Sequence, residues 1–395
     1  MIAPFSLARL PRIEFGAGSL RRLPDIAGAY GTRVLLVTGK SSFDTSAEGA
    51  WLCETLRARG FTWDQVRVAG EPSPQLVDDT VARYRGDAFD VVVGLGGGSA
   101  LDAAKAIAGL LRPGNSVMDH LEGVGPELPY RGPATPFIAV PTTAGTGSEA
   151  TKNAVLSVHG ATGFKKSFRD ERLVAEWAIV DPDLLAGCPP ALIAADGMDA
   201  FTQLLESFVS LRANPFTDAL ARSGIAAVKD GLIEWFEGGA QAARARERMA
   251  YASLLSGICL AQTGLGSVHG LAAPLGAFFP IPHGVACGTT VSAATHVNIT
   301  ALLGRDPDSA ALSKYAEIGR CLAATAELDD DAARVELVAV LERWQRALDL
   351  PRLSHYGVHA DDVPRIVAAS RGSSMKTNPI VLTDAEVAAI VTARL

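Results

Sequence analysis

Four side chains in the second half of the chain are of the types that hold a divalent cation. Asp199 and Gln203 lie four residues apart in a stretch whose apolar residues recur at helical spacing, so we expect both on one face of a buried helix. His269 and His283 follow in an apolar stretch rich in Pro and Gly. One carboxylate, one amide and two imidazoles form a suitable ligand set. Asp199, His269 and His283 are therefore candidate catalytic residues.

Prolines indicate which elements carry these ligands. Pro189 and Pro190 interrupt any helix before them, so the helix that carries Asp199 is expected to begin near this point. Between the two histidines, three prolines exclude one continuous helix. The two imidazole rings must therefore come from separate elements that converge on the same point.

A glycine-rich loop in the first half of the chain has the composition of a phosphate-binding turn. It consists of Gly96, Gly97, Gly98 and Ser99, after a predicted strand at 90–95 and before a predicted helix at 100–111. Glycines let the backbone approach a ligand closely, and a helix N-terminus attracts phosphate. Ser99 stands where an N-cap is expected, with Asp102 three residues later. A tight turn without a ligand is the alternative, since the loop departs from the GxGxxG pattern.

A second polar loop follows the predicted strand at 136–140. It is rich in hydroxyl side chains and glycine, and it includes Thr142, Thr143 and Ser148. In an open α/β sheet, loops at the carboxyl ends of the strands are the place where nucleotides bind. Two such loops together favour nucleotide binding over a simple turn.

Strand and helix signals alternate through the first half and then change to helical signals alone. The predicted strands are 34–37, 90–95, 136–140 and 178–182, and a helix is predicted at 51–59. Beyond Pro190, residues 216–236 and 240–260 carry helical periodicity. We therefore expect an α/β dinucleotide-binding, Rossmann-like domain at 1–187 and an all-helical domain at 188–395.

Composition and charge exclude several other classes of function. The 395 residues are 48% hydrophobic, and the net charge of -7 comes without a basic stripe, so nucleic acid is not an expected partner. No apolar run reaches the roughly 18 residues of a membrane span, and no signal peptide is recognisable, so we expect a cytoplasmic protein that does not bind membranes. Five cysteines without CxxC spacing indicate reduced thiols, and a small buried residue is expected at Cys287.

Four motifs, in order along nearly the whole chain, resemble those of the iron-containing (group III) alcohol dehydrogenases. They are Gly96–Lys105, Pro141–Glu149, Gly197–Ala200 with Glu206, and His269 with Pro282-His283-Gly284. The resemblance implies a fold similar to that of dehydroquinate synthase, with NAD(P) and a divalent metal in the cleft between the two domains. It also implies hydride transfer between the nicotinamide and a small alcohol or the corresponding aldehyde or ketone.

The resemblance also assigns roles to single residues. Glycines of the 96–98 turn and Ser99 would hold the pyrophosphate, Asp102 would lie near the middle of the cofactor, and Lys165 near a ribose. Thr142, Thr143 and Ser148 would line the second cofactor loop. At the end of the first strand, where NAD-preferring members often carry an acid, this chain has Gly39, Lys40 and Ser41, which favours NADP over NAD. The metal positions of the family fall on Asp199, Gln203, His269 and His283.

Two positions depart from the family pattern. Gln203 replaces the usual His, and Ala273 replaces a further active-site His. Fe²⁺ or Zn²⁺ is the expected metal, but an amide oxygen is a harder and weaker ligand than imidazole, which makes Mn²⁺ a further candidate. Two other functions stay open: a metal-independent NAD(P)H reductase of an oxo-acid, similar to maleylacetate reductases, and a catalytically silent nucleotide-binding homologue kept for assembly. The segment Pro11–Gly18 resembles a strand that pairs across a dimer in similar proteins, so a homodimer or larger homo-oligomer is expected.

Overall fold

Runs of buried valine and leucine form a parallel sheet in the first half of the chain. Val34–Val37 and Val91–Val93 are almost completely buried, as expected for strands covered on both faces. Six strands of the described residues pair in the order β1-β8-β5-β4-β2-β3, with parallel neighbours throughout. Their bounds are β1 (Arg12–Phe15), β2 (Arg33–Gly39), β3 (Thr62–Val68), β4 (Val91–Gly96), β5 (Phe137–Pro141) and β8 (Trp177–Val180).

This computed structural model describes residues 2, 4–160 and 162–395. The chain divides into two units. The α/β unit comprises Ala8–Val158 and Lys165–Gly187, and the helical unit comprises Cys188–Leu395 together with the residues up to Leu7 and the segment His159–Phe164.

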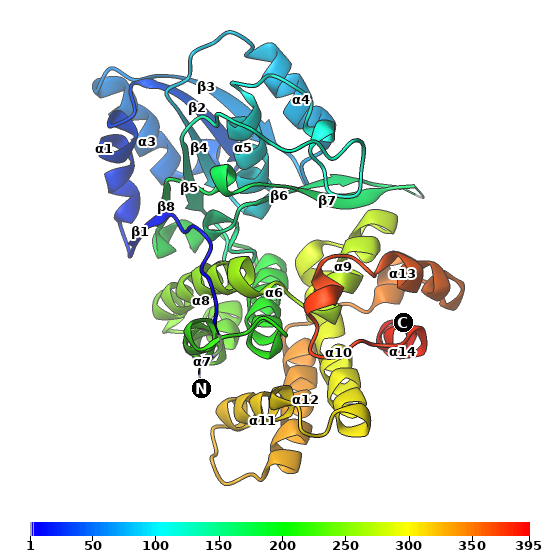
Figure 1. Cartoon of the computed structure of the whole chain (residues 1–395). Helices are drawn as coiled ribbons and strands as arrows, with labels where there is room; N and C mark the ends of the chain where they lie inside the picture. Colours follow the sequence, from blue (N-terminus) through cyan, green and yellow to red (C-terminus); the bar gives the residue numbers. More distant parts are fainter. Residues whose placement is uncertain (1, 3, 161) are drawn as a thin grey trace. The chain divides into compact units, whose positions relative to one another are not determined.

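Helices cover both faces of the sheet (Figure 1). On one face, α1 (Leu23–Gly28) and α3 (Ala47–Ala58) bury their leucines against alternate residues of β2, β4 and β5. On the other face, α5 (Gly98–Leu110) packs against β4 so closely that a Cβ at Gly94 would come within 2.8 Å of the Ala104 Cβ. The remaining elements are α2 (Ser42–Thr45), α4 (Pro74–Arg83) and a separate two-stranded sheet of β6 (Asn153–Val158) and β7 (Phe164–Arg169).

The strand order places the predicted glycine-rich cofactor loop after β4 at a topological switch point. The chain adds β3 on one side of β2 and then returns to add β4 on the other side. In open α/β sheets, ligands bind at the carboxyl ends of the strands where the order reverses in this way. The ends of β2 and β4, which carry Gly39 and Gly96, are these strands.

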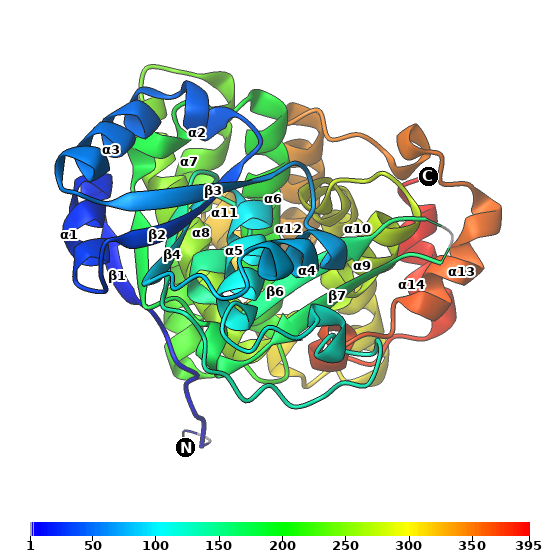
Figure 2. The same cartoon turned by 90° about the horizontal axis from the view of Figure 1, so that it is seen from above.

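The second half of the chain forms the helical unit around α6. This helix begins at Pro190, where proline is favourable at the first position, and is buried on all sides from Gly197 to Val209. It packs against α7, α8 and α10, whereas α13 lies beside α14 (Figure 2). The bounds are α6 (Pro190–Val209), α7 (Pro215–Glu237), α8 (Ala242–Thr263), α9 (Ser267–Phe278), α10 (His283–Arg305), α11 (Ala310–Ala323), α12 (Asp330–Ala347), α13 (Val363–Ala369) and α14 (Asp384–Thr392).

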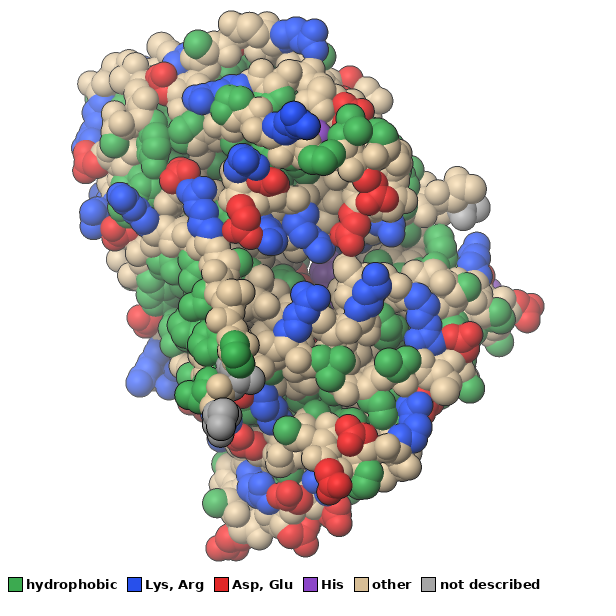
Figure 3. All heavy atoms as spheres, viewed as in Figure 1, with side chains coloured by type: hydrophobic (Ala, Val, Ile, Leu, Met, Phe, Trp, Pro, Cys, Tyr) green, Lys and Arg blue, Asp and Glu red, His purple; other side chains and the backbone are tan. Residues whose placement is uncertain are grey.

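The predicted fold class is confirmed, a parallel-sheet α/β half followed by a helical half. The four predicted strands correspond to β2, β4, β5 and β8, and the predicted helices correspond to α3, α5, α7 and α8. Within the described residues, no helix is both long enough and apolar enough to cross a bilayer. On the face seen in Figure 3, Lys and Arg side chains intermingle with Asp and Glu.

Candidate active site and metal centre

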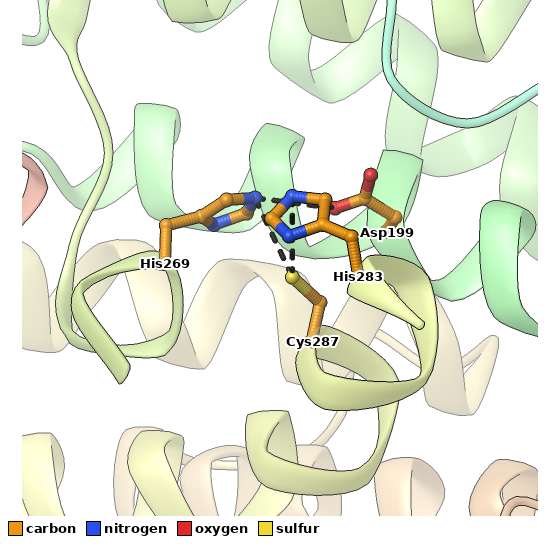
Figure 4. Close-up of side chains that lie close together, drawn as sticks. All are labelled: Asp199, His269, His283 and Cys287. Carbon is orange, nitrogen blue, oxygen red and sulfur yellow. Dashed lines mark hydrogen bonds and ion pairs between the residues drawn. The ribbon is translucent and has the colours of Figure 1, made fainter. Parts of the chain in front are cut away.

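Three helices of the helical unit bring Asp199, His269 and His283 together (Figure 4). The Asp199 Oδ1 atom on α6 lies 3.1 Å from Nε2 of His269 on α9 and 3.9 Å from Nε2 of His283 on α10. α9 ends at Phe278, and α10 begins at His283, so the two rings do come from separate helices. Asp199 and His269 are buried, whereas the His283 side chain is 27% exposed. Solvent therefore reaches the cluster from the His283 side.

Glu206 holds the far side of the His269 ring. Its Oε2 atom lies 2.6 Å from His269 Nδ1, and its Oε1 atom accepts a hydrogen bond of 2.7 Å from the Val268 backbone N–H. Because an ionised carboxylate can only accept hydrogen bonds, the Nδ1 atom carries a hydrogen and donates a hydrogen bond to Glu206. The other ring nitrogen, Nε2, faces Asp199 Oδ1 at 3.1 Å, where it can donate a hydrogen bond to the carboxylate or offer a lone pair to a cation between them. A carboxylate that orients a histidine in this way is the usual partner of a metal-binding imidazole.

Gln203 contacts the second oxygen of Asp199. Its amide nitrogen lies 3.3 Å from Asp199 Oδ2, and its amide oxygen accepts a 2.8 Å hydrogen bond from the Ser256 hydroxyl. Asp199 thus presents Oδ1 to the two histidines and Oδ2 to Gln203. Gln203 and Asp199 lie next to each other on one face of α6, as predicted. Metal ligation by Gln203 stays a prediction.

Cys287 belongs to the same cluster, although its sequence context indicates only a small buried residue. Its Sγ atom lies 3.6 Å from His269 Nε2 and 3.9 Å from His283 Nε2 (Figure 4). The side chain is completely buried. Its position four residues after His283 places both on one face of α10. That spacing, the same as between Asp199 and Gln203, is the signal that could have identified it.

The charges of this cluster suit a divalent cation. Burial opposes ionisation of Asp199, yet His283, His269 and Cys287 bring its pKa down to about 2, so this carboxylate is ionised at neutral pH. Burial raises the pKa of the Cys287 thiol to about 12. The possible ligand atoms of Asp199, His269, His283 and Cys287 all lie within 4.8 Å of one another. A buried carboxylate, two imidazoles and a thiol are the donor types that hold Zn²⁺ or Fe²⁺, so the residues present fit such an ion.

In the α/β unit, several residues of the predicted cofactor loops lie close together at the ends of β2, β4 and β5. A Cβ at Gly96 would come within 3.2 Å of the Gly39 nitrogen, and a Cβ at Gly98 within 2.7 Å of the Thr146 side chain. The Thr142 N–H donates a 3.0 Å hydrogen bond to the Gly96 carbonyl. Glycine is therefore needed where these loops touch. Gly97, Ser99, Thr143 and Ser148 belong to the same two loops, and Lys40 and Ser41 are exposed after β2.

The predicted N-cap at Ser99 is wrong. α5 begins at Gly98 after Gly97, and no side chain caps it. Asp102 is not part of a capping box: its carboxylate accepts hydrogen bonds from the Ser148 hydroxyl at 2.5 Å and from the Val155 N–H at 3.1 Å. The close approach of Gly98 to the loop after β5 fixes the start of the helix, and Asp102 ties that loop to it.

Two lysines of the α/β unit have well-defined partners. Lys105, completely buried, donates hydrogen bonds to the Ser148 carbonyl at 2.8 Å and the Asn153 carbonyl at 2.6 Å, which adds a second anchor between α5 and the loop after β5. Lys165, predicted near a cofactor ribose, forms an ion pair of 2.5 Å with Glu71. The sequence motif includes Lys105, but the groups to which its ammonium donates hydrogen bonds become apparent only in the fold.

Comparisons with known proteins match both halves of the chain. The family described as iron-containing alcohol dehydrogenase matches residues 11–182, and the Fe-containing alcohol dehydrogenase family, C-terminal, matches residues 193–395. Alcohol dehydrogenase 4 of Saccharomyces cerevisiae is 31% identical over 390 residues, which cover 97% of this chain and 96% of that protein.

Solved structures agree over the full length. The crystal structure of a 1,3-propanediol oxidoreductase matches with a TM-score of 0.89 and 29% identity over 100% of both chains. The sulfoacetaldehyde reductase from Bifidobacterium kashiwanohense in complex with NAD⁺ matches with a TM-score of 0.83 and 27% identity over 99% of both chains. The motifs, the fold and these matches coincide along the same residues, so the chain belongs to the iron-containing alcohol dehydrogenase family and is an oxidoreductase that acts on CH–OH groups.

Proposed function

We propose that this chain transfers hydride between the nicotinamide of NADP or NAD and the carbinol carbon of a small alcohol, with a divalent metal held by Asp199, His269 and His283. The reverse reaction reduces the corresponding aldehyde or ketone. One observation carries the proposal: a buried, ionised carboxylate faces two imidazoles from separate helices, and one of these imidazoles is held by Glu206 so that its Nε2 atom faces the carboxylate.

Each residue of the cluster has a separate task. Asp199 supplies negative charge, and His269 and His283 supply neutral nitrogen donors. Glu206 keeps the proton of His269 on Nδ1, so Nε2 stays available as a ligand. A bound Fe²⁺ or Zn²⁺, or Mn²⁺ as the further candidate, would act as a Lewis acid toward the alcohol oxygen.

The proton of the alcohol leaves on the His283 side. Ala273 offers no group that can accept a proton. The His269 side chain is only 6% exposed, whereas that of His283 is 27% exposed, so water reaches the cluster next to His283. Water on the His283 side therefore carries the proton to solvent.

The proposed cofactor site uses the loops at the ends of β2, β4 and β5. The Gly96–Ser99 turn includes the first residues of α5, whose N-terminal amides favour a pyrophosphate, and Thr142, Thr143 and Ser148 line the neighbouring loop. Asp102 and Lys165 complete the proposed set. NAD⁺ bound to the sulfoacetaldehyde reductase of similar structure supports a nicotinamide cofactor. Gly39, Lys40 and Ser41 offer no carboxylate to a 2′-phosphate, which favours NADP.

We further propose that the chain forms a homodimer through β1. This strand lies at one edge of the six-stranded sheet, and an edge strand presents unpaired backbone groups to a partner. Ile13 and Phe15 on β1 are each 38% exposed, although both are apolar. Sedimentation of the purified protein tests this: a monomer at micromolar concentration would contradict the proposal.

Metal removal tests the main proposal. The purified protein is analysed for metal, dialysed against a chelator, and assayed with NADP⁺ and NAD⁺ on short primary alcohols and diols, and with NADPH on the matching aldehydes. We expect chelation to abolish turnover and Fe²⁺ or Zn²⁺ to restore it. Full activity after complete metal removal would instead indicate the metal-independent reductase, and absence of turnover with every cofactor and substrate would indicate the silent homologue.

A further inference from the structure

We propose that Cys287 is the fourth metal ligand in this chain, and that Gln203 positions Asp199 instead of binding the ion. This inference rests on the proposed metal-dependent function and specifies its ligand set. The set is then one carboxylate oxygen, two imidazole nitrogens and one thiolate sulfur, from Asp199, His269, His283 and Cys287.

Four of the six separations among the donor atoms are close to those of a tetrahedral site. With zinc–nitrogen bonds of about 2.1 Å and zinc–sulfur bonds of about 2.3 Å, nitrogen and sulfur ligands of one tetrahedron lie about 3.6 Å apart. The Cys287 Sγ atom lies 3.6 Å from His269 Nε2 and 3.9 Å from His283 Nε2. Asp199 Oδ1 lies 3.1 Å and 3.9 Å from the same two nitrogens. These distances lie on either side of the separation of about 3.3 Å expected for oxygen and nitrogen ligands of one tetrahedron. Small side-chain adjustments therefore suffice to enclose an ion.

Gln203 is already engaged by other groups. Its amide nitrogen faces Asp199 Oδ2, and its amide oxygen accepts the Ser256 hydroxyl hydrogen bond. Turning the amide around would place its oxygen next to the ionised carboxylate, where the two negative atoms repel each other. Donation to Oδ2 keeps Asp199 Oδ1 directed toward the histidines. This is the role of a hydrogen-bond partner behind a metal ligand.

Another buried cysteine of the helical unit, Cys259, shows that burial alone does not place a thiol beside imidazole nitrogens. Cys259 on α8 is also completely buried, but its Sγ atom lies 3.6 Å from the Thr217 carbonyl oxygen. Cys287 instead lies beside two imidazole nitrogens, on the same helix face as His283. Cys259 is therefore the matched control for any effect of removing a buried thiol from the helical unit.

A thiolate ligand reverses the metal preference that Gln203 alone would give. As the sulfur–metal bond forms, the S–H bond breaks and its proton passes to solvent. Thiolate is a soft donor that favours Zn²⁺ and Fe²⁺ over Mn²⁺ and Mg²⁺. Asp199 and Cys287 together then balance the two positive charges of the ion. Zinc expands to five ligands in catalytic sites, so four protein donors still leave a position for a substrate oxygen.

Cobalt spectroscopy tests the ligand set independently of activity. The full-length wild type and the Cys287→Ser, Cys259→Ser and Gln203→Ala variants are stripped of metal and titrated with Co²⁺. We expect a near-ultraviolet thiolate-to-cobalt charge-transfer band at one Co²⁺ per chain in the wild type, in Cys259→Ser and in Gln203→Ala, and no band in Cys287→Ser. The Zn²⁺ affinity of Cys287→Ser should fall by at least about 100-fold. Loss of a residue that only hydrogen-bonds to a metal ligand costs up to about this much, and loss of a ligand should cost more.

Two outcomes overturn the inference and are distinguishable. If Co²⁺ binds the wild type without a charge-transfer band, Cys287 is not a ligand, while the metal-dependent function stands. If neither Co²⁺ nor Zn²⁺ binds, the metal-dependent function falls together with the inference. Should Cys287→Ser fail to fold, X-ray absorption of the Zn²⁺-loaded wild type decides: one sulfur at about 2.3 Å supports Cys287, and a shell of nitrogen and oxygen only contradicts it.

Discussion

At the scale of single residues, two carboxylates of α6 act on opposite sides of one imidazole. Asp199 and Glu206 lie seven residues apart, which places them on the same face of α6. Asp199 Oδ1 is 3.1 Å from His269 Nε2, and Glu206 Oε2 is 2.6 Å from His269 Nδ1. The shorter contact places a proton on Nδ1, and Nε2 faces Asp199, as a hydrogen-bond donor to it or, with a cation between them, as a ligand. Two anionic neighbours on one buried histidine make sense when a cation lies between Asp199 and Nε2.

Replacing Glu206 by Gln should therefore weaken metal binding. The glutamine amide oxygen can accept from the Val268 N–H only if the NH2 group faces His269 Nδ1, and this donation forces the ring proton onto Nε2 and blocks the lone pair. We expect Zn²⁺ affinity to fall about 10- to 100-fold, as for other partners of metal-binding histidines. Isothermal titration of the metal-free protein measures this. The matched control is Glu237→Gln at an exposed position of α7, and equal affinities of the two variants would contradict the assigned role.

The cofactor preference also depends on a single position. An Asp at Gly39 would place a carboxylate where a 2′-phosphate is proposed to bind, and a Cβ at Gly39 would meet only the Ser42 hydroxyl, at an ordinary 3.5 Å. We expect Gly39→Asp to weaken NADPH binding by about tenfold or more, which is about 1.4 kcal/mol, and to affect NADH far less. Fluorescence titration with both cofactors measures the ratio. Gly39→Asn has the same shape without the charge, so an equal loss in this variant would rule out repulsion as the cause.

At the scale of elements, the sequence predicts those whose pattern agrees with their burial. The apolar runs at 34–37 and 90–95 are buried on both faces of the sheet, and their strands were predictable. β3 and β7 were not, because the edge strand β3 (TWDQVRV) and the strand β7 (FKKSFR) of the small sheet carry many polar residues. The start of α5 was predicted wrongly because it depends on a contact between Gly98 and Thr146, which are distant in sequence.

The candidate site divides in the same way. Residue types and family motifs indicate Asp199, His269 and His283, and the fold brings these three together. Cys287 stands four residues after His283, but its position beside His269 depends on where α9 and α10 converge. The hydrogen bond from Gln203 to Asp199 Oδ2 likewise depends on side-chain orientation, which spacing along a helix does not specify.

The anchor between α5 and the loop after β5 makes stability depend on pH. Glu149 is buried beside Lys105, and burial raises its pKa from 4.5 to about 7. The folded state thus prefers the neutral acid. Stabilisation by the neutral form is fully present below about pH 4.5, where the unfolded chain also keeps the Glu149 proton. Between about pH 4.5 and 7 the unfolded chain releases this proton more readily than the folded chain, and above about pH 7 the stabilisation has been lost.

Glu149→Gln resembles the neutral acid at every pH and should remove this dependence. We expect the variant and the wild type to have similar free energies of unfolding below about pH 4.5. Their difference should grow in favour of the variant up to about pH 7, to about 3 kcal/mol, and stay constant above it. Urea unfolding at several pH values measures the difference. The exposed Glu48→Gln serves as the control, and a difference that did not change with pH would refute the assignment.

At the scale of the whole molecule, the two proposed ligands are held by different units. The metal cluster lies on α6, α9 and α10 of the helical unit. The proposed cofactor residues, from Gly39 to Lys165, lie in the α/β unit. Hydride transfer needs both ligands at once, but the residues proposed to bind each of them belong to separate units. Metal binding and nucleotide binding should therefore be largely independent as equilibria.

Chelation should accordingly abolish turnover while leaving NADPH affinity within about threefold of that of the metal-loaded protein, a difference of less than 1 kcal/mol. Saturating metal should protect α6, α9 and α10 from hydrogen exchange, because the ion joins three helices of one core. At 100 times its dissociation constant, a ligand adds about 2.7 kcal/mol to the stability of the state that binds it. NADPH should instead protect β4, β5 and α5. Mass spectrometry of exchanged peptides separates the two effects, and Glu206→Gln, with weakened metal binding, should lose the first protection and keep the second. If chelation removed NADPH binding as well, nucleotide binding would depend on the metal centre. This result would contradict the expectation that the two units bind their ligands independently.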